Sequence, residues 1–197
     1  MKWNIIIMLF LLSACSSKLN RKEKNEGGII SVFMVDDQDR IQGEKEVTHP
    51  DGYIMELSHY IDDELQGQRT IFYDNGKPEL IEYYENGLLQ GPYKAYYPSG
   101  QLKYEVPYHK NVMEGTFTQY YESGVVKEQL QFKENEENGP FVEYHNNGEK
   151  KWEGHYKNGD NEVGELLEFD TAGRLIKKML CDDSSVCKTT WTIADEN

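Results

Sequence analysis

Two cysteines near the C-terminal end of the chain could take part in chemistry. Cys181 and Cys187 stand six positions apart. In an exported protein such a pair can close a small disulfide loop. The alternatives are two free thiols in a reducing compartment, or a metal pair, although no histidine lies nearby in the sequence to complete a zinc site. The spacing favours the disulfide and leaves the two alternatives open.

The five histidines do not combine into a catalytic or metal-binding set. His49 and His145 are 96 residues apart, as are His59 and His155. With the 24-residue period described below, four repeats of two strands at about 4.8 Å per strand span about 38 Å. Neither pair can share a metal or a substrate within one extended array. We therefore predict a chain with no cofactor and no metal site.

Known catalytic motifs do not occur either. The sequence holds no Gly-x-Ser-x-Gly, no phosphate loop and no His-Glu-x-x-His. Residues 36–39, Asp-Asp-Gln-Asp, lack the glycine and the distant glutamate of a calcium loop, which favours a solvated acidic turn. We predict that the protein is not an enzyme. A hydrolytic enzyme that uses one histidine is kept as the second alternative function.

A third cysteine, Cys15, ends an N-terminal stretch with the organisation of an export signal. Lys2 precedes an apolar run over residues 5–12, which is too short to span a bilayer as a mature helix. The following Leu-Ser-Ala-Cys resembles the lipobox of bacterial lipoproteins. That resemblance implies cleavage after residue 14 and a diacylglyceryl group, with palmitate-type acyl chains, on Cys15. We predict a lipoprotein signal peptide over 1–14.

The next segment and the predicted location follow from the same resemblance. Residues 15–28 are polar beyond the cysteine and show no periodicity, which predicts a lipidated residue followed by a flexible tether. The mature protein is expected in the cell envelope, held to a membrane by its lipid. Ser16 is not the acidic residue that known sorting rules associate with retention, which favours the outer membrane if the cell has one.

Composition and charge narrow the fold and the partners. Hydrophobic residues make up 38%, whereas there are 14 tyrosines and 17 glycines, which favours short strands, tight turns and cores of aromatic rings. Loss of residues 1–14 would change the formal net charge from −14 to −15. Such a charge disfavours nucleic acid and permits a basic protein partner. It is repelled by an anionic membrane surface, so the lipid must provide the attachment.

The strongest pattern is an internal repeat of 24 residues. One series of glycines keeps a spacing of 24 residues over four intervals and then one of 25, and a second series follows nine residues later in each unit. Two parallel series across six units predict a repeat protein. The members are Gly43, Gly67, Gly91, Gly115, Gly139 and Gly164, and Gly52, Gly76, Gly100, Gly124, Gly148 and Gly173.

Each unit has the features of a β-hairpin. Turn sequences such as Asp74-Asn75-Gly76 end in a glycine, and the strand after the turn alternates, with Leu102 and Tyr104 on one face and Lys103 on the other. We predict an all-β fold, an elongated antiparallel meander of six 24-residue hairpin repeats in a single-layer sheet. The repeats cover residues 43–180, with an N-terminal cap strand over 29–42 and a C-terminal cap over 181–197.

The repeat resembles the bacterial variant of the MORN repeat. Residues 91–103 and 115–124 carry its signature, a glycine, an aromatic residue, two further aromatics in a row, and a turn before an alternating strand. The resemblance covers about residues 43–179 and implies a hairpin array. It does not imply a single function, because members of the family act as scaffolds, protein-binding surfaces and proposed lipid binders. Many bacterial variants are labelled antitoxin-like or immunity-like.

We therefore predict a non-catalytic protein-binding module of the envelope, of the immunity or antitoxin-like kind, with a structural envelope scaffold as the alternative. The expected partner is a protein, of basic character. We expect neither nucleic acid nor a small-molecule ligand. Tyrosine is favoured at binding surfaces, although the same rings are needed to hold the sheet. The candidate binding stripe consists of Tyr73, Tyr97, Tyr121, Tyr84, Tyr108 and Tyr156.

Overall fold

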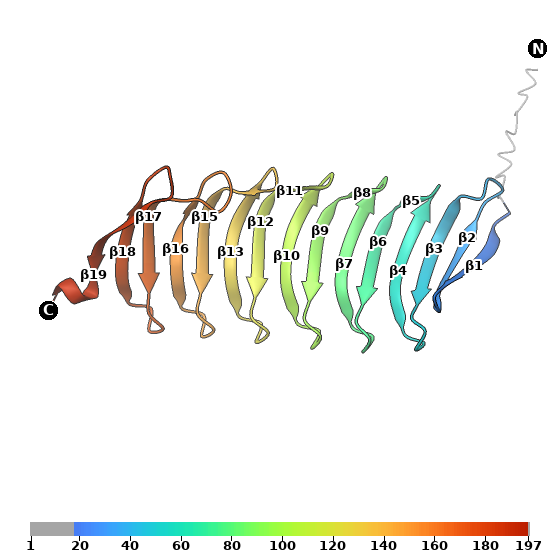
Figure 1. Ribbon diagram of the computed structural model, residues 1–197, viewed down its shortest axis with the longest axis horizontal. Coiled ribbons are helices and arrows are strands. Elements are labelled where there is room, and N and C mark those ends of the chain that lie inside the picture. Colours follow the sequence, from blue (N-terminus) through green and yellow to red (C-terminus); the bar gives the residue numbers. More distant parts are fainter. Residues whose placement is uncertain (1–17, 197) are drawn as a thin grey trace, which may run out of the picture.

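The computed structural model describes residues 18–196, which form one open antiparallel sheet (Figure 1). Strands that follow one another in the chain pair with one another, from β1 at one edge to β19 at the other. A single 3₁₀ turn, η1 (Ile193–Glu196), follows the last strand. The strands are β1 (Asn20–Glu26), β2 (Ile29–Val35), β3 (Ile41–Thr48), β4 (Ile54–Ile61), β5 (Glu64–Leu65), β6 (Gly67–Phe72), β7 (Pro78–Glu85), β8 (Leu88–Leu89), β9 (Gly91–Tyr96), β10 (Leu102–His109), β11 (Val112–Met113), β12 (Gly115–Tyr120), β13 (Val126–Lys133), β14 (Glu136–Glu137), β15 (Gly139–Tyr144), β16 (Lys150–Tyr156), β17 (Glu162–Phe169), β18 (Leu175–Cys181) and β19 (Cys187–Thr192).

Six hairpins make up the repeats, which confirms the predicted fold class. They are β3–β4, β6–β7, β9–β10, β12–β13, β15–β16 and β17–β18. Each hairpin shifts its register beside its turn, as a β-bulge does. The hairpin turns lie along one long side of the array, and the connections between units lie along the opposite long side (Figure 1).

The N-terminal end of the array corrects the predicted tether. Residues 15–28 were expected to be a flexible tether, but β1 forms within them and pairs with β2 over seven residue pairs. Gly27 and Gly28 connect the two strands, with φ angles of 64° and 93°. A two-residue turn with positive φ at both positions matches the twist of a hairpin. An edge strand needs no apolar face, so a polar sequence can form it.

The charged side chains of β1 protect the edge of the sheet. All seven residues of this strand are exposed, and Lys22 and Lys24 lie among them. Lysines on an edge strand oppose pairing with another chain. Replacing both lysines by valine is expected to produce concentration-dependent oligomers in size-exclusion chromatography with light scattering. The same change at Lys103 and Lys133, exposed residues of the internal strands β10 and β13, should leave the protein monomeric. Equal association of both variants would contradict the edge explanation.

Two turns, one near each end of the array, are each stabilised by an aspartate that accepts hydrogen bonds from backbone N–H groups of its own turn. Asp36 accepts backbone hydrogen bonds from Gln38 and Arg40 at 2.9 and 3.0 Å, and Asp170 accepts them from Ala172 and Arg174. Burial would raise the pKa of Asp36, but these bonds and the Arg40 side chain outweigh it and lower the pKa to about 2. The prediction of a solvated acidic turn is therefore wrong for Asp36, whose side chain is buried.

The best-packed part of the sheet lies in its C-terminal half and on one face. Leu130, Phe141, Leu166 and Cys181 form the buried cluster. They come from β13, β15, β17 and β18, so the cluster joins three consecutive units. Burial of this cluster couples each unit to the next, as in other repeat arrays. Within residues 18–196, no helix has the length and apolarity to cross a membrane.

Candidate binding face

One face of the sheet carries a continuous row of aromatic rings, and we call it the aromatic face. Residues opposite each other on neighbouring strands share a face, and the rings of Tyr93, Tyr104 and Phe117 follow one another across β9, β10 and β12. Their centroids are 6.1 and 5.8 Å apart. Phe117 continues to Phe132 at 6.1 Å. Tyr108, Phe141, Trp152 and Tyr156 complete the face.

The backbone conformation explains why the first glycine series is periodic. Gly91, Gly115 and Gly139 have φ angles of 92°, 112° and 119°, which L-residues with a side chain rarely adopt. Their cross-strand partners are aromatic: Gly91 is paired with Tyr108, Gly115 with Phe132, and Gly139 with Tyr156. The period seen in the sequence is therefore that of a backbone conformation which recurs in every unit, opposite a row of rings.

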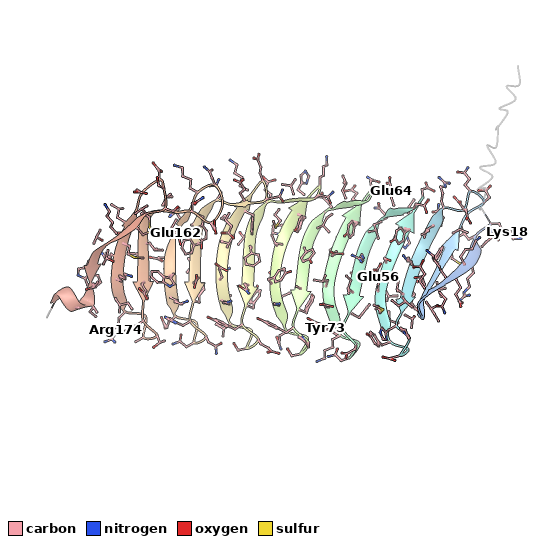
Figure 2. The ribbon with its side chains drawn as sticks, viewed as in Figure 1. Lys18, Glu56, Glu64, Tyr73, Glu162 and Arg174 are labelled. Atoms are coloured by element: carbon pink, nitrogen blue, oxygen red, sulfur yellow. A yellow bond between two sulfur atoms is a disulfide. The ribbon has the colours of Figure 1, made fainter. Side chains whose placement is uncertain are left out.

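The structure does not bring the six tyrosines of the predicted stripe together. Tyr84, Tyr108 and Tyr156 lie in the row opposite the glycines. Tyr73, Tyr97 and Tyr121 lie on the long side of the array that carries the hairpin turns. Figure 2 shows Tyr73 on this side, Glu64 on the opposite side and Glu56 between them.

The tyrosines beside the turns connect each unit to the next. Tyr73 donates a hydrogen bond to the carbonyl oxygen of Tyr96, Tyr97 to that of Tyr120, and Tyr121 to that of Tyr144, at 2.7–2.8 Å. His145 contacts the carbonyl oxygen of Phe169 at 3.0 Å in the same way. These hydroxyls are used within the fold, so three of the six tyrosines already have a structural role.

Removal of one such hydroxyl should have a measurable cost. Tyr97→Phe is expected to lower the free energy of unfolding by about 1 kcal/mol, because the carbonyl of Tyr120 loses its partner. The control is Tyr96→Phe, since that hydroxyl makes no hydrogen bond within residues 18–196 and its loss should be nearly neutral. Urea unfolding of both variants measures the difference. Equal effects would show that the hydroxyl of Tyr97 does not connect the units.

A polar cluster interrupts the aromatic face in its N-terminal half. Arg69 bonds Glu56 at 2.7 Å and Glu82 at 2.9 Å, and the side chains of these three residues are 25%, 18% and 9% exposed. Burial would raise the pKa of Glu56, but the hydrogen bonds from Arg69 and Ser58 outweigh it, so the pKa lies below its ordinary value. Glu82 also accepts a hydrogen bond from the hydroxyl of Tyr84 at 3.2 Å. The charges of the three residues are therefore paired with one another.

The C-terminal half of the aromatic face is hollowed. A pocket of about 260 Å³ opens there, and the rings of Phe141 and Tyr156 stack beside it at 4.1 Å. Burial and four nearby carboxylates raise the pKa of Tyr156. Sequence reasoning selected Tyr156 but missed the pocket. Its lining residues are Phe141, Glu143, Trp152, Tyr156, Glu162, Leu166 and Met179.

The cysteines and histidines occupy separate places. The structure joins Cys181 and Cys187, which are cross-strand partners on β18 and β19, by a disulfide. Cys15 and the signal segment lie outside the described residues. His59, His109 and His155 are exposed on three different strands. Across residues 18–196, no group of three or more His, Cys, Asp or Glu side chains could hold a metal ion.

The fold and the face define a class of protein: an open, single-layer array of hairpin repeats with one aromatic face. Within the array, residues 65–86, 89–110 and 113–134 each match the family model of the MORN repeat variant. The chain therefore contains three consecutive MORN-variant repeats, which are the hairpins β6–β7, β9–β10 and β12–β13. No curated protein matches the chain. MORN repeats typically mediate protein or membrane binding.

Proposed function

We propose that this chain is a lipid-anchored, non-catalytic module of the cell envelope that binds a protein partner, in the manner of an immunity or antitoxin-like protein. The observation that carries the proposal is the aromatic face. Among the described residues, no element packs over Tyr93, Tyr104 and Phe117, whose rings follow one another across three strands. These three rings are half-buried within the sheet, and partly exposed aromatic surface of this kind is typical of protein-binding sites.

The charge of the chain indicates the character of the partner. With a formal net charge of −14 before processing, the body attracts basic proteins and repels anionic membrane surfaces. A protein partner with a basic surface fits both the rings and the charge. The immunity-type role adds that the partner is a toxic protein whose action the binding prevents, and it is supported by the resemblance to bacterial repeat-variant proteins that carry this label.

The alternative of a structural scaffold has less support. An array that assembles through its sheet edges needs edge strands that accept another chain, whereas β1 presents seven exposed and mostly charged residues. Binding through the face requires no free edge. We therefore favour the binding module over a self-assembling scaffold, and we propose no catalytic role.

Affinity capture tests the binding role. The full chain, crosslinked in its own envelope and analysed by mass spectrometry, is expected to yield one abundant basic partner. Replacing Tyr104 and Phe117 by serine should abolish the crosslink, whereas replacing Lys94 and Gln129, on the opposite face, should preserve it. A partner retained by both variants would contradict binding through the aromatic face. Protection of cells from that partner would test the immunity-type role.

The lipid anchor has its own test. Cys15→Ser is expected to release the protein from the membrane fraction, because several acyl chains are what a stable attachment requires. Mass spectrometry of the N-terminal peptide should find the acyl chains on wild-type Cys15. Cys187→Ser is the control and should stay with the membrane. Unchanged membrane attachment of the Cys15 variant would contradict the anchor.

A further inference from the structure

The pocket on the aromatic face combines rings with carboxylates. Phe141, Trp152 and Tyr156 supply aromatic walls, and Glu143 and Glu162 lie on its lining. Figure 2 shows Glu162 on β17 toward the C-terminal end of the array. Aromatic faces attract organic cations because the ring carries partial negative charge above its plane. Carboxylates at the same opening strengthen that attraction.

Two further glutamates lie near Tyr156, outside the lining of the pocket. Glu128 and Glu137 lie close enough to Tyr156 for their charges to act on its hydroxyl, together with those of Glu143 and Glu162. Glu128 is the cross-strand partner of Glu143. Burial comes first and neighbouring carboxylates second among the causes that raise the pKa of Glu128 and of Glu137. Burial and repulsion between neighbouring carboxylates therefore disfavour the ionised form of Glu128 and Glu137 in this fold.

Few cations of the chain neutralise this charge. Lys151 contacts Glu143 at 3.1 Å, with side chains 43% and 32% exposed. No ion pair to Glu128, Glu137 or Glu162 occurs in the described part of the chain. Lys127 and Lys151 also act on the charge of Glu128. Four carboxylates therefore stand against two ammonium groups, and the excess is available to a cation from outside.

Comparison with the other units shows that Glu137 and Glu162 depart from the repeat. They stand where earlier units have Leu65, Leu89 and Met113. The columns of Glu128 and Glu143 are mixed: they hold Leu80 and Tyr104, and Ile71 and Ala95, but also Glu56 in unit one and Gln119 in unit four. Apolar residues would stabilise the face better than half-buried carboxylates do. Departures from local consistency of this kind are expected at functional sites.

The chemistry of the pocket selects the class of cation. A metal ion is disfavoured, since no three of the described carboxylates, histidines or cysteines group closely enough to bind one. An ammonium or guanidinium group can use the rings and the carboxylates together. A choline headgroup in a membrane is a poorer fit, because Tyr104, Phe117 and Phe132 extend the aromatic face for about two units beyond the pocket, which suits a polypeptide.

We propose that the pocket between Phe141, Trp152 and Tyr156 receives a lysine or arginine side chain of a protein partner, whose neighbouring residues lie on the aromatic face. The proposal rests on the protein-binding function above and names the point of recognition. The side chain inserts its cationic group among the four glutamates. Its aliphatic part packs against Trp152 and Met179.

The test uses the full chain, solubilised in neutral detergent, with a nona-arginine peptide as the probe. Calorimetric titration is expected to show binding that weakens about tenfold in the double variant Glu128→Gln, Glu137→Gln. Trp152→Leu, which keeps the apolar volume but removes the aromatic face, should weaken it about 2- to 30-fold. The glutamine variant should also unfold at a higher temperature than the wild type, because it relieves the unfavourable carboxylates.

Matched controls separate this pocket from general acidity. Glu153→Gln with Glu165→Gln makes the same charge change on β16 and β17, on the opposite face of the sheet. Trp191→Leu removes a ring from β19, away from the pocket. These variants should change the affinity less than twofold.

The outcomes distinguish this proposal from the function on which it rests. Equal weakening by the pocket variants and the controls, or binding of choline-headgroup vesicles in place of the peptide, would overturn the cation pocket. A partner that is captured through the aromatic face but is indifferent to Glu128→Gln, Glu137→Gln would also overturn it, while the binding module stands. If peptide binding weakens in the pocket variants but not in the controls, the cation pocket is supported even when envelope capture yields no partner. In that case only the proposed function fails.

Discussion

Replacing Phe141 by alanine is expected to lower the free energy of unfolding by about 3–5 kcal/mol. Phe141 is 3% exposed and packs with Leu130, Leu166 and Cys181 in the buried cluster. Its ring also stacks on Tyr156 at a centroid distance of 4.1 Å. A single-layer sheet has no second layer that could move in to fill the space, so the cavity should stay open and the full effect should appear in urea unfolding.

The place of the effect is as informative as its size. Because each unit contacts only its neighbours, loss of Phe141 should weaken the coupling of unit five to units four and six. Hydrogen exchange should accelerate in β13 and β15–β18 and change little in β6–β7. Val142→Ala, on the opposite face of the same strand, is the control and should cost about 1 kcal/mol or less. A uniform loss of protection along the array would contradict nearest-neighbour coupling.

The repeat explains why most of the fold could be predicted from the sequence. Glycines such as Gly91 and Gly115 keep the 24-residue period because each unit needs a positive φ at this position, 92° and 112° for these two. The turn glycines are periodic because each hairpin needs the same turn. A requirement that recurs in every unit leaves a visible pattern, and six copies of that pattern predict strands, turns and connectivity together.

Features that occur once were harder to predict. The strand β1 has no apolar alternation, because an exposed edge strand has no face to bury; only Gly27 and Gly28 indicate its hairpin. The burial of Asp36 could not be read from its acidic neighbours. Its turn resembles that of Asp170, where an arginine four residues later bonds the same carboxylate. That pair of Asp-x-x-x-Arg sequences is the signal that could have found it.

The candidate site was predictable only in part. The sequence identified columns of tyrosines but not which of them use their hydroxyls within the fold, because Tyr73 and Tyr97 bond carbonyl groups 23 residues away. The glutamates around the pocket could have been found by comparing units, since Glu137 stands in a column of Leu89 and Met113. Their convergence on one ring depends on strand pairing, which the column alone does not give.

Breaking the polar cluster at the other end of the face should be nearly as costly as the loss of Phe141. Arg69→Met is expected to lower the free energy of unfolding by about 2–4 kcal/mol near neutral pH, because Glu56 and Glu82 are left as unpaired, mostly buried charges. The partial exposure of the three side chains keeps the value below that of a fully buried pair. Urea unfolding at constant ionic strength measures it.

The pH dependence of this variant has a definite sign. In the wild type the pKa of Glu56 lies below its ordinary value of 4.5, so its contribution is complete above that pH and is lost as the pH falls below it. Without Arg69, burial raises the pKa of the same carboxyl group, and protonation then relieves the variant. The difference between wild type and variant should therefore shrink on acidification. A constant difference would show that Arg69 acts through packing and not through its charge.

Other units of the array have apolar residues at the positions that Arg69, Glu82 and Glu56 take in the polar cluster. Unit four has Phe117 and Leu130 at the positions of Arg69 and Glu82, and unit two has Leu80 at the position that Glu56 takes in unit one. The triple variant Arg69→Phe, Glu82→Leu, Glu56→Leu should therefore recover the stability lost in Arg69→Met and reach or exceed that of the wild type. Replacement of a buried ion cluster by matching apolar residues is often neutral or stabilising, since no charge remains to be desolvated. A triple variant as unstable as Arg69→Met would mean that the geometry of unit two cannot accept the packing of unit four, and that the polar cluster is what allows these strands to pair.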